Sequence, residues 1–160
     1  FISSVVFKLQ KAPQLNLDYP ELAAQLRGKT KLSIKDVSNA VCAIRQRKLP
    51  DPAKIPNVGS FFKNPIISQS QASELKRLHP AIPLYDYKDA FKTSAAWLIE
   101  QAGFKGRCQN GVCTAAQHAL IIINPEHKSA QAVLDYASSI QSAVQRQFAL
   151  ALSLEPRVCC

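Results

Sequence analysis

The segment Gly59–Pro65 carries the polar residues best placed for chemistry. Its sequence, Gly-Ser-Phe-Phe-Lys-Asn-Pro, puts the Ser60 hydroxyl before two aromatic residues, and Lys63 and Asn64 after them. Glycine allows a positive φ or a close approach of the backbone, and Pro65 restricts the exit. An apolar anchor flanked by a hydroxyl, a cation and an amide suits the wall of a binding pocket. The alternative is a strand that ends in a turn, with Ser60 and Asn64 bonded to local backbone.

The sequence on both sides of this segment resembles that of a known protein family. Lys48-Leu-Pro-Asp-Pro, followed by Asn57-Val-Gly-Ser-Phe-Phe-Lys-Asn-Pro, is similar to the C-terminal region of UDP-N-acetylenolpyruvoylglucosamine reductases, the flavoenzymes of peptidoglycan synthesis. The likeness covers most of the chain. It continues through Ala96-Trp-Leu-Ile, Gly103-Phe-Lys-Gly, His118-Ala-Leu with Asn124, and Leu154-Glu-Pro, and Asp18-Tyr-Pro-Glu-Leu resembles the inserted loop of one subgroup.

This resemblance implies roles for individual residues. Ser60 matches the family's serine, a general acid that protonates the carbanion left after hydride transfer to an enolpyruvyl group. Four further positions match substrate-binding residues: Tyr19, Lys48, Asn64 and Tyr85. Tyr87 is close enough to Tyr85 to compete for the place beside the uracil ring.

One catalytic position departs from the family pattern. The family wording near the end is Leu-Glu-Pro-Glu-Val-Arg, whose second glutamate is catalytic. Here Leu154-Glu-Pro is followed by Arg157, and the sequence then diverges. Glu155 matches the first, non-catalytic glutamate, so the catalytic role is not carried over to it.

The resemblance also implies cofactors that this chain does not hold by itself. The family uses NADPH to reduce FAD, and the reduced flavin reduces UDP-N-acetylglucosamine enolpyruvate. No glycine-rich phosphate cradle occurs in the sequence, so we expect FAD and NADPH to be bound mainly by a domain outside it. We therefore expect residues 1–48 to be the end of the FAD-binding domain and residues 49–160 to be the substrate-binding domain.

Composition bounds the alternatives. A length of 160 residues with 47% apolar residues suits one domain with a sizeable core. The net charge of +9 attracts anions, either nucleic acid or phosphorylated small molecules. Between Arg27 and Lys48 no aromatic residue interleaves the cations, which disfavours a nucleic-acid platform. A UDP-sugar-binding module without catalysis and a basic nucleic-acid-binding domain remain as alternatives. We expect a cytoplasmic monomer that contacts neither nucleic acid nor membrane.

The five cysteines match no disulfide framework or zinc pattern. Cys42 lies on a helical pattern and is expected to be buried. Cys108 and Cys113 are close enough to meet across a loop, but we expect free thiols in a reducing compartment for these two, Cys159 and Cys160.

The local patterns predict an α+β fold. Helices are expected over 33–48, 70–78, 93–101 and 129–148, the first capped by Ser33 with Asp36 at its third position. Strands are expected over 1–9, 118–124 and 149–158, and a loop over 11–31. His79 is expected to be exposed, and His118 to be bonded to backbone rather than to a ligand.

Overall fold

The computed structural model describes residues 2–158, which form two compact units, one ending at Arg47 and the other beginning at Lys48. Both contain helices, and the second has two antiparallel sheets, so the α+β prediction is confirmed. No helix within residues 2–158 has the length and apolar character needed to cross a membrane.

The first unit is built from α1 (Pro20–Leu26) and from α2 (Ile34–Lys48) as far as Arg47, and the last residue of α2, Lys48, belongs to the second unit. Four buried side chains, Leu22, Leu26, Ala40 and Ile44, form its small core. The predicted loop over 11–31 is wrong for α1. Pro20 occupies the first turn of that helix, where its missing N–H costs nothing.

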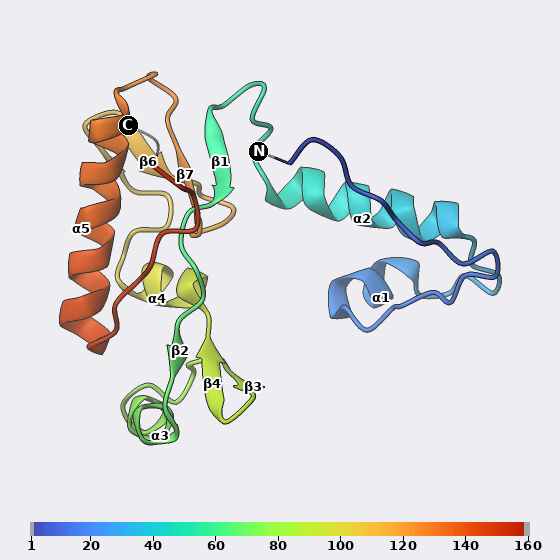
Figure 1. Cartoon of the computed structure of the whole chain (residues 1–160), viewed down its shortest axis with the longest axis horizontal. Coiled ribbons are helices and arrows are strands. Elements are labelled where there is room, and N and C mark those ends of the chain that lie inside the picture. Colours follow the sequence, from blue (N-terminus) through green and yellow to red (C-terminus); the bar gives the residue numbers. More distant parts are fainter. Residues whose placement is uncertain (1, 159–160) are drawn as a thin grey trace. The chain divides into compact units, whose positions relative to one another are not determined.

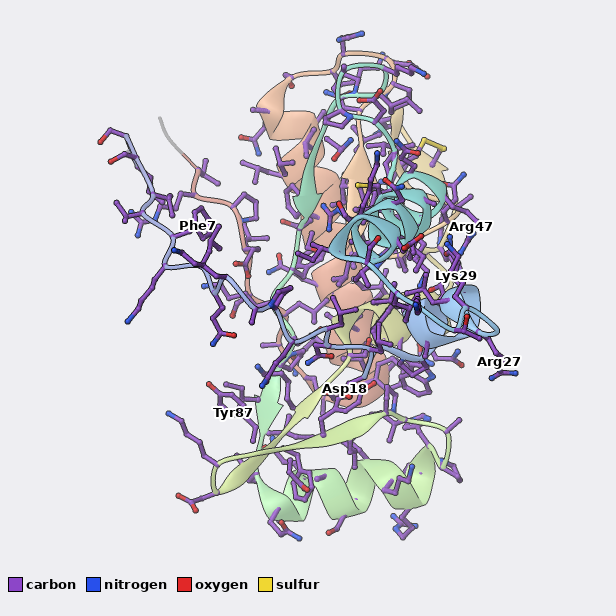
Figure 2. The ribbon with its side chains drawn as sticks, turned by 90° about the vertical axis from the view of Figure 1, so that its right-hand side faces the viewer. Phe7, Asp18, Arg27, Lys29, Arg47 and Tyr87 are labelled. Carbon is purple, nitrogen blue, oxygen red and sulfur yellow. A yellow bond between two sulfur atoms is a disulfide. The ribbon has the colours of Figure 1, made fainter. Side chains whose placement is uncertain are left out.

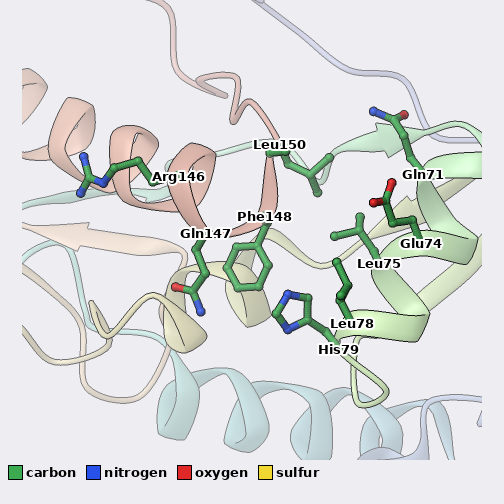
Figure 3. Close-up of a pocket in the computed structure, with 10 residues that line it drawn as sticks. Gln71, Glu74, Leu75, Leu78, His79, Arg146, Gln147, Phe148 and Leu150 are labelled. Atoms are coloured by element: carbon green, nitrogen blue, oxygen red, sulfur yellow. The ribbon is translucent and has the colours of Figure 1, made fainter.

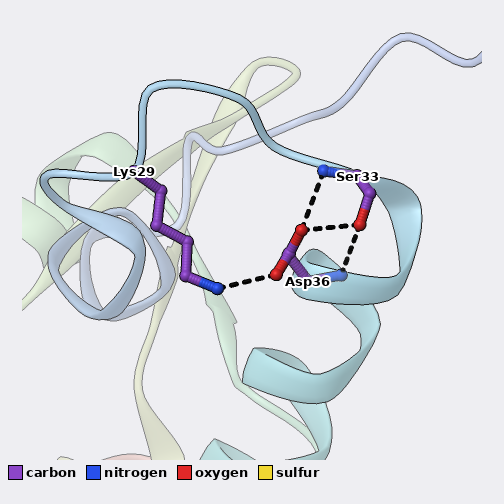
Figure 4. Close-up of polar contacts among 3 residues, drawn as sticks. All are labelled: Lys29, Ser33 and Asp36. Carbon is purple, nitrogen blue, oxygen red and sulfur yellow. Dashed lines mark hydrogen bonds and ion pairs between the residues drawn. The ribbon is translucent and has the colours of Figure 1, made fainter.

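Polar contacts fix the start of α2, as Figure 4 shows. The Asp36 carboxylate accepts hydrogen bonds from the backbone and the hydroxyl of Ser33, at 3.0 and 2.6 Å, and from the Lys29 ammonium at 2.6 Å. The Asp36 N–H donates back to the Ser33 hydroxyl at 3.2 Å, so the predicted cap is confirmed. These bonds, led by the one from Lys29, hold the pKa of Asp36 well below its usual value.

Two predictions for the first unit are wrong. Residues 2–9 form no strand and pair with no strand in the described chain, although Val6 and Leu9 are among several exposed apolar side chains. A β-branched pattern gives a strand only where a partner satisfies its backbone groups. Phe1, the first residue of that prediction, lies outside the described residues. Cys42 is exposed on α2 rather than buried.

The second unit has a four-stranded sheet in the order β1-β7-β6-β5 and a three-stranded sheet in the order β2-β4-β3. Figure 1 shows α5 running along the first sheet and α3 beside the second. The strands are β1 (Asn57–Ser60), β2 (Ile66–Ile67), β3 (Leu84–Tyr87), β4 (Ala90–Thr93), β5 (Cys108–Gln109), β6 (Val112–Thr114) and β7 (Ile121–Ile123). The helices are α3 (Gln69–Leu78), α4 (Ala95–Gln101) and α5 (Ala130–Phe148).

Helix caps and one large core hold this unit together. Ser68, Ser94 and Ser129 cap α3, α4 and α5 by accepting backbone N–H bonds. The apolar stripe of α5 packs into the core that also contains Phe61 and Phe62. The aromatic anchor in the centre of the Gly59–Pro65 segment is therefore core material, and it fixes the polar residues on either side.

The end of the chain and the short hairpin differ from expectation. The predicted strand over 149–158 is wrong, because only Leu154 in this range forms a β-bridge, with Phe62.

Cys108 and Cys113 form a disulfide, so the prediction of free thiols is wrong for this pair. Asn110 and Gly111, both with positive φ, make the tight turn that brings β5 and β6 together. Cys159 and Cys160 lie outside the described residues.

Candidate functional site

Ser60 is the last residue of β1 and lies opposite Ile121 of β7. The register shifts between Asn57 and Ser60, and Gly59 between them has a φ of +76°. Such an irregularity can turn a side chain away from the pleat of the sheet. The Ser60 side chain is exposed and makes no hydrogen bond within residues 2–158. The alternative in which the Ser60 hydroxyl bonds to local backbone is therefore not what the structure shows.

Asn64 joins the segment to a helix far along the chain. Its Oδ1 accepts a hydrogen bond of 2.9 Å from the N–H of Ala95, the first residue of α4. This bond fixes the plane of the exposed carboxamide. The side-chain NH₂ of Asn64 donates to no group in the part of the chain that the structure describes, and so remains available to an acceptor.

The end of the chain runs antiparallel to the aromatic pair. The N–H of Lys63 donates to the carbonyl of Ser153 at 2.9 Å, and that of Glu155 to the carbonyl of Phe61 at 3.0 Å. Glu155 therefore lies beside the residue that follows Ser60. Arg157, two positions further, is exposed. The tail thus reaches the candidate site, although it forms no regular strand.

His118 lies in the turn before β7 and feels the charge of two lysines. The Nδ1 of His118 accepts a hydrogen bond of 3.3 Å from the N–H of Leu120, which confirms the predicted backbone bond. Burial lowers the pKa of His118, and the positive charges of Lys48 and Lys105 lower it further. The carbonyl of Leu120 accepts from the N–H of Phe61 at 2.8 Å, which ties this turn to the Ser60 strand.

The charges that act on His118 come from residues that the sequence only partly singled out. Lys48 was a candidate from the resemblance, whereas Lys105 was not considered a site residue. Its only sequence signal was its place in Gly103-Phe-Lys-Gly. Lys105 also donates to the Glu100 carboxylate at 2.9 Å, which offsets part of its charge. The remaining positive charge near His118 favours an anionic ligand, because opposite charge raises its local concentration.

The lowered pKa of His118 predicts a pH-dependent stability. The unfolded chain protonates this imidazole at its ordinary pKa, near 6.5, whereas the folded chain holds it neutral to lower pH. The contribution is therefore complete above pH 6.5 and is lost as the pH falls below it. We expect the free energy of unfolding to be lower at pH 5 than at pH 7.5, and His118→Asn to flatten this difference while keeping an acceptor for Leu120.

Chemical denaturation at the two pH values measures this effect. His127→Asn is the matched control, because His127 is exposed and has a φ of 50°, which asparagine tolerates. Asp36 titrates in a lower range and does not contribute between pH 5 and 7.5. If His118→Asn and the parent chain lose equal stability on acidification, the neutral imidazole is not the cause.

The two tyrosines of β3 differ in what covers them. Tyr85 is 59% exposed. The Tyr87 ring is only partly exposed and has the Lys92 ammonium 4.1 Å from its centre, a cation–π contact. Figure 2 shows Tyr87 at the hairpin of β3 and β4. The geometry therefore favours Tyr85 as the ring with an open face. Tyr19 lies in the first unit, where it is exposed and precedes α1.

A separate groove of about 260 Å³ lies between α3 and the end of α5 (Figure 3). His79 lines it and packs edge-on against Phe148, with ring centres 4.9 Å apart, so its predicted exposure is wrong: the ring is half-buried. Phe148 reaches this histidine from the end of α5, a contact that local sequence does not reveal. No group of three or more His, Cys, Asp or Glu residues within 2–158 could hold a metal ion.

A match to the model of a protein family decides which family the chain belongs to. Residues 51–159 match the C-terminal domain of UDP-N-acetylenolpyruvoylglucosamine reductase. The chain belongs to this family. The resemblance inferred from the Ser60 segment is therefore confirmed. The match covers the strand that carries Ser60, the hairpin that carries Tyr85 and the His118 turn.

Curated relatives agree with this assignment. A UDP-N-acetylenolpyruvoylglucosamine reductase of Dechloromonas aromatica is 42% identical over 158 residues, which are 97% of this chain and 47% of the relative. One of Xylella fastidiosa is 38% identical over 161 residues, with 98% and 46% covered. The chain thus spans about half the length of the curated relatives it matches. These relatives are named as an enzyme, a reductase.

Proposed function

We propose that the chain is the C-terminal part of an FAD-dependent, NADPH-using reductase of peptidoglycan synthesis. It would convert UDP-N-acetylglucosamine enolpyruvate to UDP-N-acetylmuramate in the cytoplasm. The observation that carries the proposal is the exposed Ser60 hydroxyl at the irregular end of β1, which makes no hydrogen bond within residues 2–158. It lies next to the turn that carries His118, on which the charges of Lys48 and Lys105 act. A proton donor near positive charge suits an anionic substrate that must take up a proton.

Ser60 is the proposed general acid. Hydride transfer to one carbon of the enolpyruvyl double bond leaves a carbanion at the other, which takes a proton from the nearest acid. A serine hydroxyl is a weak acid, but its acceptor here is a strong base, so the transfer is downhill. Because the hydroxyl makes no bond within residues 2–158, no internal bond must break before it donates.

Substrate binding is assigned to four residues. Lys48 supplies charge for the diphosphate, and the Asn64 NH₂ supplies a donor for a phosphate or sugar oxygen. Tyr85 offers an exposed ring face to the uracil. Tyr19, on the first unit, is proposed to reach the bound substrate. The open face of Tyr85 and the fixed carboxamide of Asn64 support these assignments.

The chain's own residues do not fit a flavin site. Its five glycines are scattered, and no run of them could cradle a pyrophosphate. We therefore assign FAD and NADPH to the preceding part of a complete enzyme, with residues 1–48 as the end of that domain. The flavin would supply the hydride, while residues 49–160 bind and protonate the substrate. No acid role is assigned to Glu155. Arg157 stands where the family's wording has its catalytic glutamate, either because one residue is missing and Arg157 is in register with the next position or because the tail is altered.

Calorimetric titration of the chain with UDP-N-acetylglucosamine tests the binding part of this proposal. We expect weak, saturable binding that UDP displaces. A single-stranded DNA oligonucleotide is the control ligand for the basic surface. A nucleic-acid-binding domain would bind it more tightly than the nucleotide sugar, with a steep loss of affinity as salt rises, because several phosphate contacts release counterions. That result would overturn the proposal.

A further inference from the structure

The Cys108–Cys113 disulfide joins two directly opposed residues of the β5–β6 hairpin. Cys108 is exposed, whereas Cys113 is 7% exposed. The bond, drawn in yellow in Figure 2, closes a short loop over the Asn110–Gly111 turn. Its two sulfur atoms therefore differ in access: a reagent thiol can reach Cys108, while the sheet and core cover Cys113.

The next rung of the hairpin anchors it to α5. The N–H of Thr114 donates to the carbonyl of Arg107 at 2.9 Å. The buried Tyr136 hydroxyl donates to the same carbonyl at 2.7 Å, and lies 3.0 Å from the Thr114 hydroxyl. The disulfide thus cross-links the hairpin one rung away from the point where this tyrosine bonds it.

The base of the hairpin packs on the turn that carries His118. A Cβ built on Gly106 would lie 3.6 Å from the Cα of Ala116, so the two residues are close neighbours and a side chain at position 106 would touch the turn. The same turn is closed by the N–H of Ala115, which donates to the carbonyl of Ile121 at 2.8 Å. Only Arg107 separates Gly106 from Cys108, so the cross-link lies within two residues of this contact.

We infer that Cys108 and Cys113 form a reversible thiol–disulfide latch that sets how firmly the His118 turn is held. Its importance for substrate rests on the proposed function, because the positive charges of Lys48 and Lys105 act on His118 in that turn. The latch fits a reducing compartment, where protein disulfides are typically transient or regulatory. The co-reactant is a dithiol reductant in the opening direction and its cyclic disulfide in the closing direction.

The exchange is balanced as a two-electron transfer. A thiolate of the dithiol attacks the exposed Sγ of Cys108 and breaks the protein disulfide, and Cys113 leaves as a thiolate that takes up a proton. The second thiol of the reagent then attacks the mixed disulfide and releases Cys108. The protein gains two thiols, and the dithiol becomes a cyclic disulfide. Opposed positions in one hairpin favour reclosure by the reverse path.

Alkylation and mass analysis of the whole chain test reversibility. Trypsin cleaves after Arg107 and after Lys128, so both cysteines fall in one peptide. After equilibration in mixtures of reduced and oxidised dithiothreitol and an iodoacetamide quench, we expect this peptide to carry either no label or two. The label should disappear when the protein returns to oxidised reagent. A peptide that is doubly labelled in oxidised reagent, or that never opens, would overturn the latch.

Hydrogen exchange tests the effect on the turn. Reduction should speed exchange of the Gln109–Val112 amides by about tenfold or more, because the cross-link restrains the open hairpin. Amides over residues 115–120 should change in the same direction by less, and those of α3 should not change. Cys108→Ser/Cys113→Ser should match the reduced chain without reductant, while Cys42→Ser should keep the difference. Unchanged exchange over 115–120 would overturn the inference. No nucleotide is present, so the result is independent of substrate binding.

Discussion

Replacing Ser60 with alanine is expected to slow flavin reoxidation by the enolpyruvyl sugar by about 10²- to 10⁴-fold. The setting is a complete enzyme, made by joining this chain to the N-terminal half of its Dechloromonas aromatica relative. The carbanion formed on hydride transfer would then lack the exposed hydroxyl at the end of β1. Flavin reduction by NADPH should be almost unaffected, because that step involves no enol proton. Stopped-flow traces of the two half-reactions measure both rates.

Two further variants separate acid catalysis from structure. Ser60→Cys should retain more activity than Ser60→Ala, since a thiol is also an acid. Ser73→Ala removes another exposed serine hydroxyl, one that bonds only its own helix α3, and should leave both half-reactions unchanged. If Ser60→Ala reoxidises at the parental rate, or slows both half-reactions equally, Ser60 is not the proton donor.

The second large effect is expected from Lys48→Ala, which should weaken UDP binding by about 1.5–3 kcal/mol if the charged hydrogen bond to the diphosphate is well shielded. The loss corresponds to roughly ten- to 150-fold in Kd. Titration of this chain and its variant with UDP measures it. Working at pH 8 keeps His118 neutral in both proteins, which matters because Lys48 itself contributes to the lowered pKa of that histidine.

A matched control guards against a general charge effect. Arg77→Ala also removes one positive charge, but from the exposed face of α3, and should leave the UDP affinity close to the parental value. Equal affinities of the parent and Lys48→Ala would remove Lys48 from the proposed site. Equal losses in Lys48→Ala and Arg77→Ala would show that net charge, rather than a specific contact, attracts the nucleotide.

Local sequence was enough where the stabilising partners lie within a few residues. Local patterns predicted α2 through α5, and the Ser33 cap of α2, because the bonds involved join neighbours along the chain. The Ser68 cap of α3 was not predicted. Local sequence failed at Pro20, where the proline opens a helix rather than a loop. It also failed over residues 2–9, whose apolar pattern has no partner strand in the described chain.

The amino-acid sequence around Ser60 was enough to predict the family, since a long stretch of specific residues matched a known pattern. The family model confirms this prediction. Tertiary structure alone showed that the Asn64 carboxamide bonds to Ala95, that Lys48 and Lys105 act on His118, and that Cys108 faces Cys113. Contacts such as that from Asn64 to Ala95 join residues separated by a helix and a hairpin, or depend on strand register. Such contacts form when the chain packs, and spacing along the sequence does not encode them.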